Sequence, residues 1–201
     1  MTKLITVISA LFSGLVAAMD VTMIIFMRLQ KPLEKWCYVN RKRSTYIKTF
    51  GDVDIFLSKE KVMQYSDGKF VPLGMAYYPA SNVIVIFDHM IKDWNYTMST
   101  LKDALNNNSD KFDLSDLSVF NGFVHHELTH RKQFDAAVKE QNFTEKMKII
   151  KVINTGCFGE YLDKSIETEA YMAQGVYMLH TTTGKEVYFS IDEIEKLKEM
   201  V

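Results

Sequence analysis

The stretch Phe-Val-His-His-Glu-Leu-Thr-His, residues 123–130, directs the interpretation of the whole chain, because it contains His-Glu-x-x-His at His126, Glu127 and His130. On a helix, residues four apart lie on one face, so the two imidazoles can bind a single metal ion. Glu127 then lies beside the ion, where it can accept a proton from a bound water molecule. The spacing therefore predicts a metal-dependent hydrolytic site carried by a helix.

The residues around this pattern predict that its helix covers about 116–138. Gly122 lies one turn before His126, and its missing side chain predicts the close approach of a neighbouring backbone. His125 points about 100° away from His126 around the helix, so we do not expect it to bind the metal. The alternative interpretation is a surface helix with clustered histidines.

A catalytic zinc site needs a third protein ligand and an open position. Residues 165–171, Ser-Ile-Glu-Thr-Glu-Ala-Tyr, predict a second helix over 166–180, which Ser165 can cap and whose first turn is acidic. Its carboxylates, Glu167 and Glu169, are both candidates for the third ligand. A His/His/Glu set with an open position favours zinc, although other divalent ions bind such ligands too.

The His-Glu-Leu-Thr-His sequence, followed by Glu-Thr-Glu-Ala-Tyr at 167–171, resembles the small gluzincin metallopeptidases of bacteria and their phages. In that family a glutamate on a later helix, commonly in a Glu-x-x-Ala-Asp pattern, completes the metal site. The resemblance implies one zinc ion bound by His126, His130 and Glu167, with Glu169 as the alternative ligand. It also implies that Glu127 is the general base in the hydrolysis of peptide bonds.

Tyr171 stands where the family commonly has an aspartate that orients a zinc-bound histidine, so Tyr171 or another group must do this here. Gln133 matches a His-x-x-Gln continuation that some of these proteins have. Tyr161 and Tyr171 are the leading candidates to stabilise the oxyanion of a tetrahedral intermediate, and Tyr177 and His180 are others.

The region before the metal-binding helix, residues 46–92, is predicted to be extended, with a short strand at 53–57. Runs at 74–78 and 83–87 flank a four-residue turn and predict a hairpin. By the family resemblance, one of these two runs is the sheet edge that pairs with an extended peptide substrate, and the sequence favours neither. The alternative is a sheet that only covers the helices.

The remaining elements complete an α+β fold with a small antiparallel or mixed sheet, and by resemblance a zincin-like metallopeptidase domain over 46–201. They are helices at 97–106 and 145–153, a short strand or extended piece at 187–189, and a final helix to Met200 that starts with a capping box at Ser190 and Glu193.

Residues 4–27 form an apolar run whose only charge is Asp20, which predicts an N-terminal transmembrane anchor within 1–29 that contacts membrane lipid. A cleaved signal peptide and a buried helix are the alternatives. The basic residues of a juxtamembrane linker at 30–45 place the catalytic domain in the cytoplasm by the positive-inside rule.

A formal net charge of −1 gives no electrostatic reason to expect a nucleic-acid partner. The expected partner is a peptide or protein substrate. The alternative function is a catalytically degenerate, zincin-like and membrane-tethered binding protein, which the charged Arg131 beside the motif and the missing aspartate at Tyr171 favour.

Overall fold

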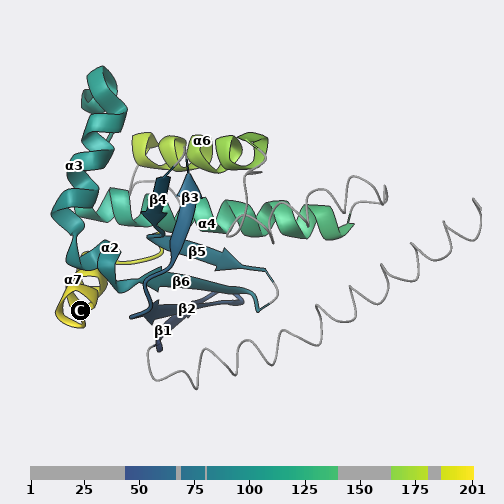
Figure 1. Cartoon of the computed structure of the whole chain (residues 1–201). Helices are drawn as coiled ribbons and strands as arrows, with labels where there is room; N and C mark the ends of the chain where they lie inside the picture. The colour runs from purple at the N-terminus through teal and green to yellow at the C-terminus, as the bar shows by residue number, and fades with distance from the viewer. Residues whose placement is uncertain (1–43, 67–68, 80, 140–163, 181–186) are drawn as a thin grey trace, which may run out of the picture.

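The computed structural model describes residues 44–66, 69–79, 81–139, 164–180 and 187–201, which form an α+β fold (Figure 1). The expected membrane anchor at 1–29, the linker up to residue 43 and the helix expected at 145–153 lie outside the described residues. Among the helices that are described, none is both long and apolar enough to cross a bilayer.

A four-stranded mixed sheet forms one layer of the fold, built from β1 Ser44–Phe50, β2 Val53–Ser58, β5 Met75–Tyr78 and β6 Val83–Phe87. The strand order is β1-β2-β6-β5. β2 and β6 are parallel neighbours at the centre, and the edge strands β1 and β5 each run antiparallel to their neighbour. Both central strands are wholly buried, as their continuous apolar sequences require.

The strands predicted at 53–57, 74–78 and 83–87 are confirmed to within one residue, and the last two form the expected hairpin. In its turn Asn82 has a φ of 54°, a left-handed conformation that asparagine adopts more readily than most residues. β6 lies inside the sheet whereas β5 lies at its edge. Of these two strands, only β5 can therefore pair with a further extended chain.

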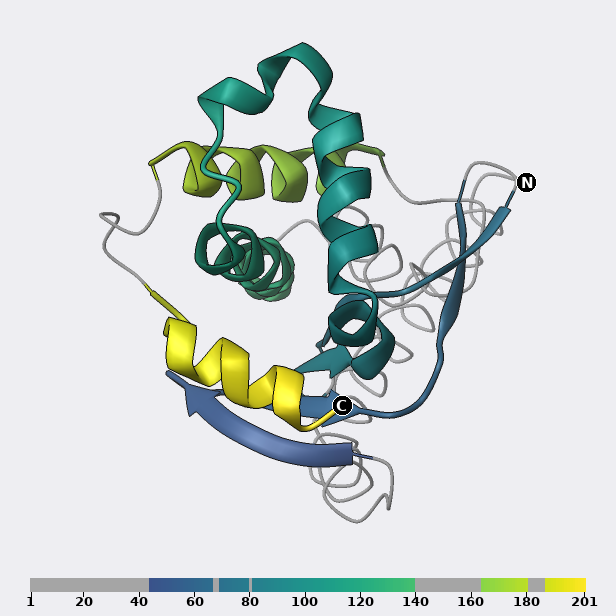
Figure 2. The same cartoon turned by 90° about the vertical axis from the view of Figure 1, so that its left-hand side faces the viewer.

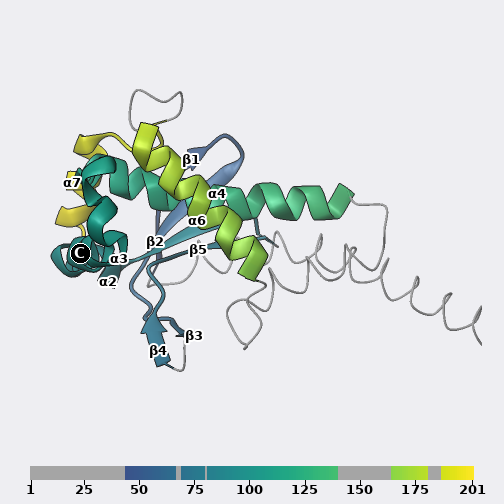
Figure 3. The same cartoon turned by 90° about the horizontal axis from the view of Figure 1, so that it is seen from above.

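A second hairpin, β3 Met63–Ser66 and β4 Lys69–Pro72, projects from the body of the molecule when the structure is seen from above (Figure 3). Its extended conformation agrees with the prediction for 46–92. The end of that prediction is wrong, because α2 Asp88–Lys92 is helical. Asp88 lies in the first turn of α2 and pairs with Lys92 one turn later, an arrangement that favours a helix locally.

The other helices are α3 Trp94–Leu105, the 3-10 helix η1 Asn106–Lys111, α4 Asp116–Lys139, α6 Lys164–His180 and α7 Ile191–Glu199. The prediction for α4 is confirmed, and α6 begins two residues earlier than expected. α7 starts with the predicted capping box between Ser190 and Glu193. α3 begins three residues before the predicted start, and η1 follows it directly.

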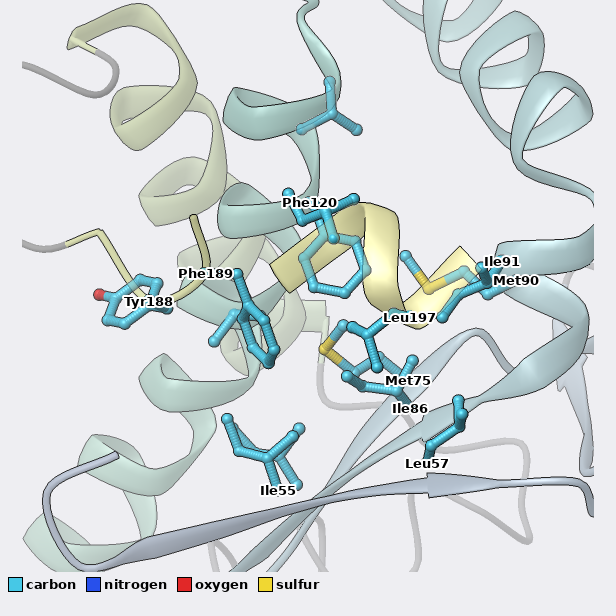
Figure 4. Packing of buried hydrophobic residues seen from close by; sticks show 14 of the residues in the cluster. Ile55, Leu57, Met75, Ile86, Met90, Ile91, Phe120, Tyr188, Phe189 and Leu197 are labelled. Atoms are coloured by element: carbon cyan, nitrogen blue, oxygen red, sulfur yellow. The ribbon is translucent and has the colours of Figure 1, made fainter. Parts of the chain in front are cut away.

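The main core lies between the sheet and the helices. Figure 4 shows Phe120 of α4, Leu197 of α7 and Phe189 meeting Met75 and Ile86 of the sheet, and each of these five side chains is buried. Seen along α4, α6 lies on one side of this helix, and α7 and the sheet lie on the other (Figure 2). α4 is therefore the central helix, in contact with β5, α6 and α7.

Of the two alternatives at 187–189, a short strand or an extended piece, the structure shows no strand, and Asn121 explains why. The Asn121 Oδ1 atom accepts hydrogen bonds from the main-chain nitrogens of Tyr188 and Phe189, at 2.9 and 2.7 Å. Its Nδ2 atom donates to the carbonyl oxygen of Phe189 at 2.8 Å. One buried amide on α4 thus satisfies main-chain groups that a neighbouring strand would otherwise satisfy.

Gly122 admits side chains of α6 rather than the backbone that the sequence had led us to expect. A β-carbon built at Gly122 would lie 2.9 Å from Met178 Cγ and 3.5 Å from Gln174 Cγ. The first separation is too short for two carbon atoms, so a residue with a side chain at this position would force α4 and α6 apart.

We predict that Gly122→Ala lowers the free energy of unfolding by about 1–2 kcal/mol, because crowding against Met178 outweighs the gain in helix propensity of at most about 1 kcal/mol. Gly175→Ala is the matched control on α6. Its β-carbon would lie 3.7 Å from Phe112 Cε1, an ordinary contact, so it should stabilise the protein by up to about 1 kcal/mol. Denaturant unfolding measures both changes, and equal stabilisation by the two variants would contradict this packing.

Candidate metal centre

Three potential metal ligands converge where α6 crosses α4. α4 carries His126 and His130 one turn apart, and α6 carries Glu167 in its first turn. The Nε2 atoms of the two histidines are 3.1 Å apart. Glu167 Oε2 lies 3.5 Å from His126 Nε2, and Glu167 Oε1 lies 3.4 Å from His130 Nε2. The structure therefore brings together the three residues that the sequence singled out as ligands.

These separations are short enough for one metal ion to bind all three residues. Ligand atoms bonded to zinc at about 2.0–2.1 Å with tetrahedral angles lie about 3.3 Å from one another. The two histidine nitrogens are 3.1 Å apart, and each has a different Glu167 oxygen at 3.4 or 3.5 Å, so each pair lies near that value. One ligand atom from each residue lies within 4.8 Å of the other two. Each residue offers one atom, so the group fits a metal ion with one position left for water or substrate.

The charges of the group are coupled. Burial lowers the pKa of His126, but the carboxylates of Glu167 and Glu127 outweigh burial and raise it above the ordinary value of 6.5. Burial raises the pKa of Glu167, but His126 and His130 outweigh burial and lower it below 4.5. Without a metal ion, the cluster therefore favours a protonated His126 beside an ionised Glu167, and a binding cation has to displace that proton.

Gln133 fixes the orientation of His130. Its Nε2 atom donates to the carbonyl oxygen of Ile166 at 3.0 Å and to Glu169 Oε2 at 2.8 Å, so both of its hydrogens point at acceptors on α6. The Oε1 atom must then accept from His130 Nδ1, 2.9 Å away. With its proton on Nδ1, a neutral His130 presents a lone pair on Nε2 to the cluster.

The two residues that could have added a fourth ligand are engaged elsewhere. Glu169, the alternative third ligand, is exposed and accepts a hydrogen bond from Gln133. His125 forms a hydrogen bond with the Tyr188 hydroxyl through Nδ1 and stacks on Tyr177. Among the described residues, the cluster thus consists of three ligands, which is typical of an open site.

Arg131 has a structural role that its position beside the motif did not reveal. Its guanidinium lies 2.7 Å from Asp52 in the turn between β1 and β2, where Gly51 adopts a φ of 61°. A second carboxylate, Asp135, lies 3.6 Å from Arg131 Nε one turn along α4. Arg131 thus ties α4 to the turn between two strands of the sheet.

Glu127 is held at the edge of the sheet. Its Oε2 atom accepts a hydrogen bond of 2.7 Å from the main-chain nitrogen of Tyr77 in β5, and the Glu127 side chain is buried. A sequence has no local signal for this contact, because it joins a side chain to a backbone group 50 residues away. The consequence is a carboxylate fixed between the ligand cluster and the free edge of β5.

Tyr171 lies against the ligand cluster, with its ring centroid 4.6 Å from that of His126. Desolvation of its hydroxyl raises its pKa, as do the charges of Glu167 and then Glu127, so the hydroxyl stays protonated and can donate. Tyr177 packs on His125 instead, and His180 lies about 20 Å from Glu167 along the axis of α6. Tyr161 lies outside the described residues.

Comparisons of this chain with protein-family models, with curated proteins and with solved structures give no match.

We predict a specific pH dependence for the stability that Glu167 confers on the metal-free protein. The lowered pKa of Glu167 stabilises the fold above pH 4.5, and this contribution is lost as the pH falls through the folded-state pKa. The raised pKa of His126 stabilises the fold below pH 6.5, and this contribution is lost as the pH rises through the folded-state pKa. Both contributions to stability are therefore fully present between pH 4.5 and pH 6.5.

Denaturant unfolding of the chelator-treated protein over a range of pH tests this window. Glu167→Gln should lower the free energy of unfolding most between pH 4.5 and 6.5 and less on either side. Glu169→Gln is the matched control, because its carboxylate faces an amide rather than the two imidazoles. A constant difference between wild type and Glu167→Gln at all pH values would contradict the coupling.

Proposed function

We propose that this chain is a zinc metallopeptidase that hydrolyses peptide bonds at the cluster of His126, His130 and Glu167. The observation that carries the proposal is the convergence of two histidine nitrogens and one carboxylate, each of which offers a ligand atom within 4.8 Å of the others. The acidic residue of the His-Glu-x-x-His pattern lies beside this cluster and is the expected base.

Zinc fits the donor set better than Mg²⁺ or Ca²⁺. Two neutral imidazoles and one carboxylate suit Zn²⁺, whereas Mg²⁺ and Ca²⁺ prefer six or more oxygen ligands. A zinc ion held there would lower the pKa of a bound water molecule to about 7 and polarise the substrate carbonyl group. The open fourth position favours a catalytic site over a structural one.

Glu127 is the proposed general base. Tyr77 holds its Oε2 atom, so Oε1 is the oxygen available to accept a proton from the attacking water. The same carboxylate then delivers this proton to the nitrogen of the leaving amine. Tyr171 is the proposed donor to the oxyanion, because its protonated hydroxyl belongs to a ring that already packs on His126.

The free edge of β5 is the proposed binding site for the substrate main chain. Gly74 accepts a hydrogen bond from Phe87 of β6, whereas the nitrogen of Tyr77 points away from β6 to Glu127. Main-chain groups alternate sides along a strand, so Met75 and Tyr77 direct theirs to the free edge. An extended peptide that pairs with this edge would bring its own carbonyl groups close to Glu127, which favours peptides as the substrate class.

This arrangement supports a zincin-like domain of the gluzincin type, in which a sheet with a free edge precedes the His-Glu-x-x-His helix and a later helix supplies the glutamate. The membrane anchor at residues 4–27 and the cytoplasmic position of the domain stay predictions from the sequence. Together these proposals describe a membrane-tethered peptidase that acts on peptides or proteins in the cytoplasm.

The metal site is tested by zinc content after purification. We expect one zinc ion per chain in the wild-type protein, loss of zinc in Glu167→Ala, and retention in Glu169→Ala, since only Glu167 lies with the two histidines. Elemental analysis gives the stoichiometry directly. Zinc-free wild-type protein, even after zinc is supplied, would refute the metal site, and loss only in Glu169→Ala would move the third ligand to Glu169.

Catalysis is tested by Glu127→Gln. This variant should keep its zinc and lose at least about 100-fold in turnover, because the amide cannot accept the proton of the water. Cleavage of unstructured peptides, followed by mass spectrometry, measures the loss. Glu199→Gln on the exposed end of α7 is the control for the same chemical change outside the site. Equal activity of Glu127→Gln and wild type would refute the mechanism.

A further inference from the structure

The outer nitrogen of His126 lacks an evident partner. Its Nδ1 atom is buried and forms no hydrogen bond within the part of the chain that the structure describes. A histidine that gives Nε2 to a metal carries its proton on Nδ1, and this proton normally goes to an acceptor that fixes the ring. A buried N–H group without an acceptor would cost about 1–3 kcal/mol.

Gln174 offers the missing acceptor. It lies seven residues after Glu167, which places both side chains on the face of α6 that meets α4, and it is only 5 % exposed. Its Oε1 atom is likewise buried without a hydrogen-bond partner among the described residues. Its Nε2 atom faces the Sδ atom of Met178, a weak acceptor, at 4.0 Å. An unpaired donor on His126 and an unpaired acceptor on Gln174 are thus buried in the same interface.

A second observation places the two groups side by side. Gln174 Cγ lies against Gly122, one turn before His126 on α4. Both unpaired groups therefore lie in the part of the α4–α6 interface that surrounds Gly122 and His126.

We propose that Gln174 is the positioning residue of His126 and that its Oε1 atom accepts the Nδ1 proton and directs Nε2 at the metal. This inference rests on the proposed metal site. Each histidine would then have a glutamine that accepts its Nδ1 proton, because Gln133 already does so for His130. Gln174 thereby takes over the task that the aspartate at the position of Tyr171 performs in the resembled family, while Tyr171 contacts the edge of the same ring.

The test compares zinc affinity with the stability of the metal-free protein in three variants. Gln174→Met keeps the volume and removes the acceptor, so we expect zinc affinity to fall about 10–100-fold. The metal-free variant should be as stable as wild type or more so, because a buried unpaired amide is removed. Gln174→Glu provides a carboxylate acceptor and should bind zinc more tightly than wild type. Met178→Leu is the packing control and should leave zinc affinity unchanged.

Titration with a competing chelator measures zinc affinity, and denaturant unfolding measures stability. In the zinc-loaded protein, NMR should resolve a slowly exchanging Nδ1 proton on His126, and Gln174→Met should make it exchange rapidly. Wild-type affinity in Gln174→Met, an equal loss in Met178→Leu, or weaker binding in Gln174→Glu would each overturn the proposal. If Gln174→Met does not fold, the zinc affinity of Gln174→Glu alone tests the proposal.

The wild-type titration separates this proposal from the proposed function. If wild-type protein binds no zinc, the metal site itself is refuted and the role of Gln174 with it. If wild type binds zinc and Gln174→Met binds it equally well, the metallopeptidase proposal stands and only the positioning role is refuted.

Discussion

The close packing of α4 against α6 is the constraint on which the candidate site depends. His126 and His130 come from one helix and Glu167 from the other, so the Glu167 oxygens reach 3.5 and 3.4 Å from the two histidine nitrogens only if the helices stay in contact. Gly122 permits this contact, because a side chain there would overlap Met178. Apolar packing therefore sets the distance between the α4 and α6 backbones, and the polar contacts across the interface form at that distance.

A second constraint ties this helix pair to the sheet. The hydrogen bond from the Tyr77 main chain to Glu127 fixes the carboxylate at the edge strand, and Arg131 fixes the next turn of α4 to Asp52. α4 thus directs His126 and His130 towards α6 and the Glu127 carboxylate towards β5. Glu127, the two histidines and Arg131 all lie on α4, so a shift of this helix would disturb the ligand cluster and both contacts with the sheet together.

The parts of the fold that follow from local patterns could be predicted from the sequence, and those that depend on distant partners could not. The α4 helix, the β5–β6 hairpin and the capping box of α7 each have a signal within a few residues, and each is confirmed. Of the two predictions at 187–189, the strand was wrong, because main-chain groups there are satisfied by Asn121, 67 and 68 residues away. The contact of Glu127 with Tyr77 joins residues 50 apart in the chain, and side-chain spacing cannot reveal it.

With Gln174 in its proposed role, both histidines would have an amide as the acceptor of the Nδ1 proton. Glu167 and Glu127 would contribute two negative charges, which together would balance the charge of one Zn²⁺ ion. A carboxylate next to either imidazole would make the ring more basic and the proposed zinc site net negative. Amide acceptors would hold the rings in the same orientation without this added charge, so a bound metal ion would keep more of its ability to polarise a carbonyl group. Such an arrangement would exchange metal affinity for Lewis acidity, which is the balance that the proposed hydrolysis requires.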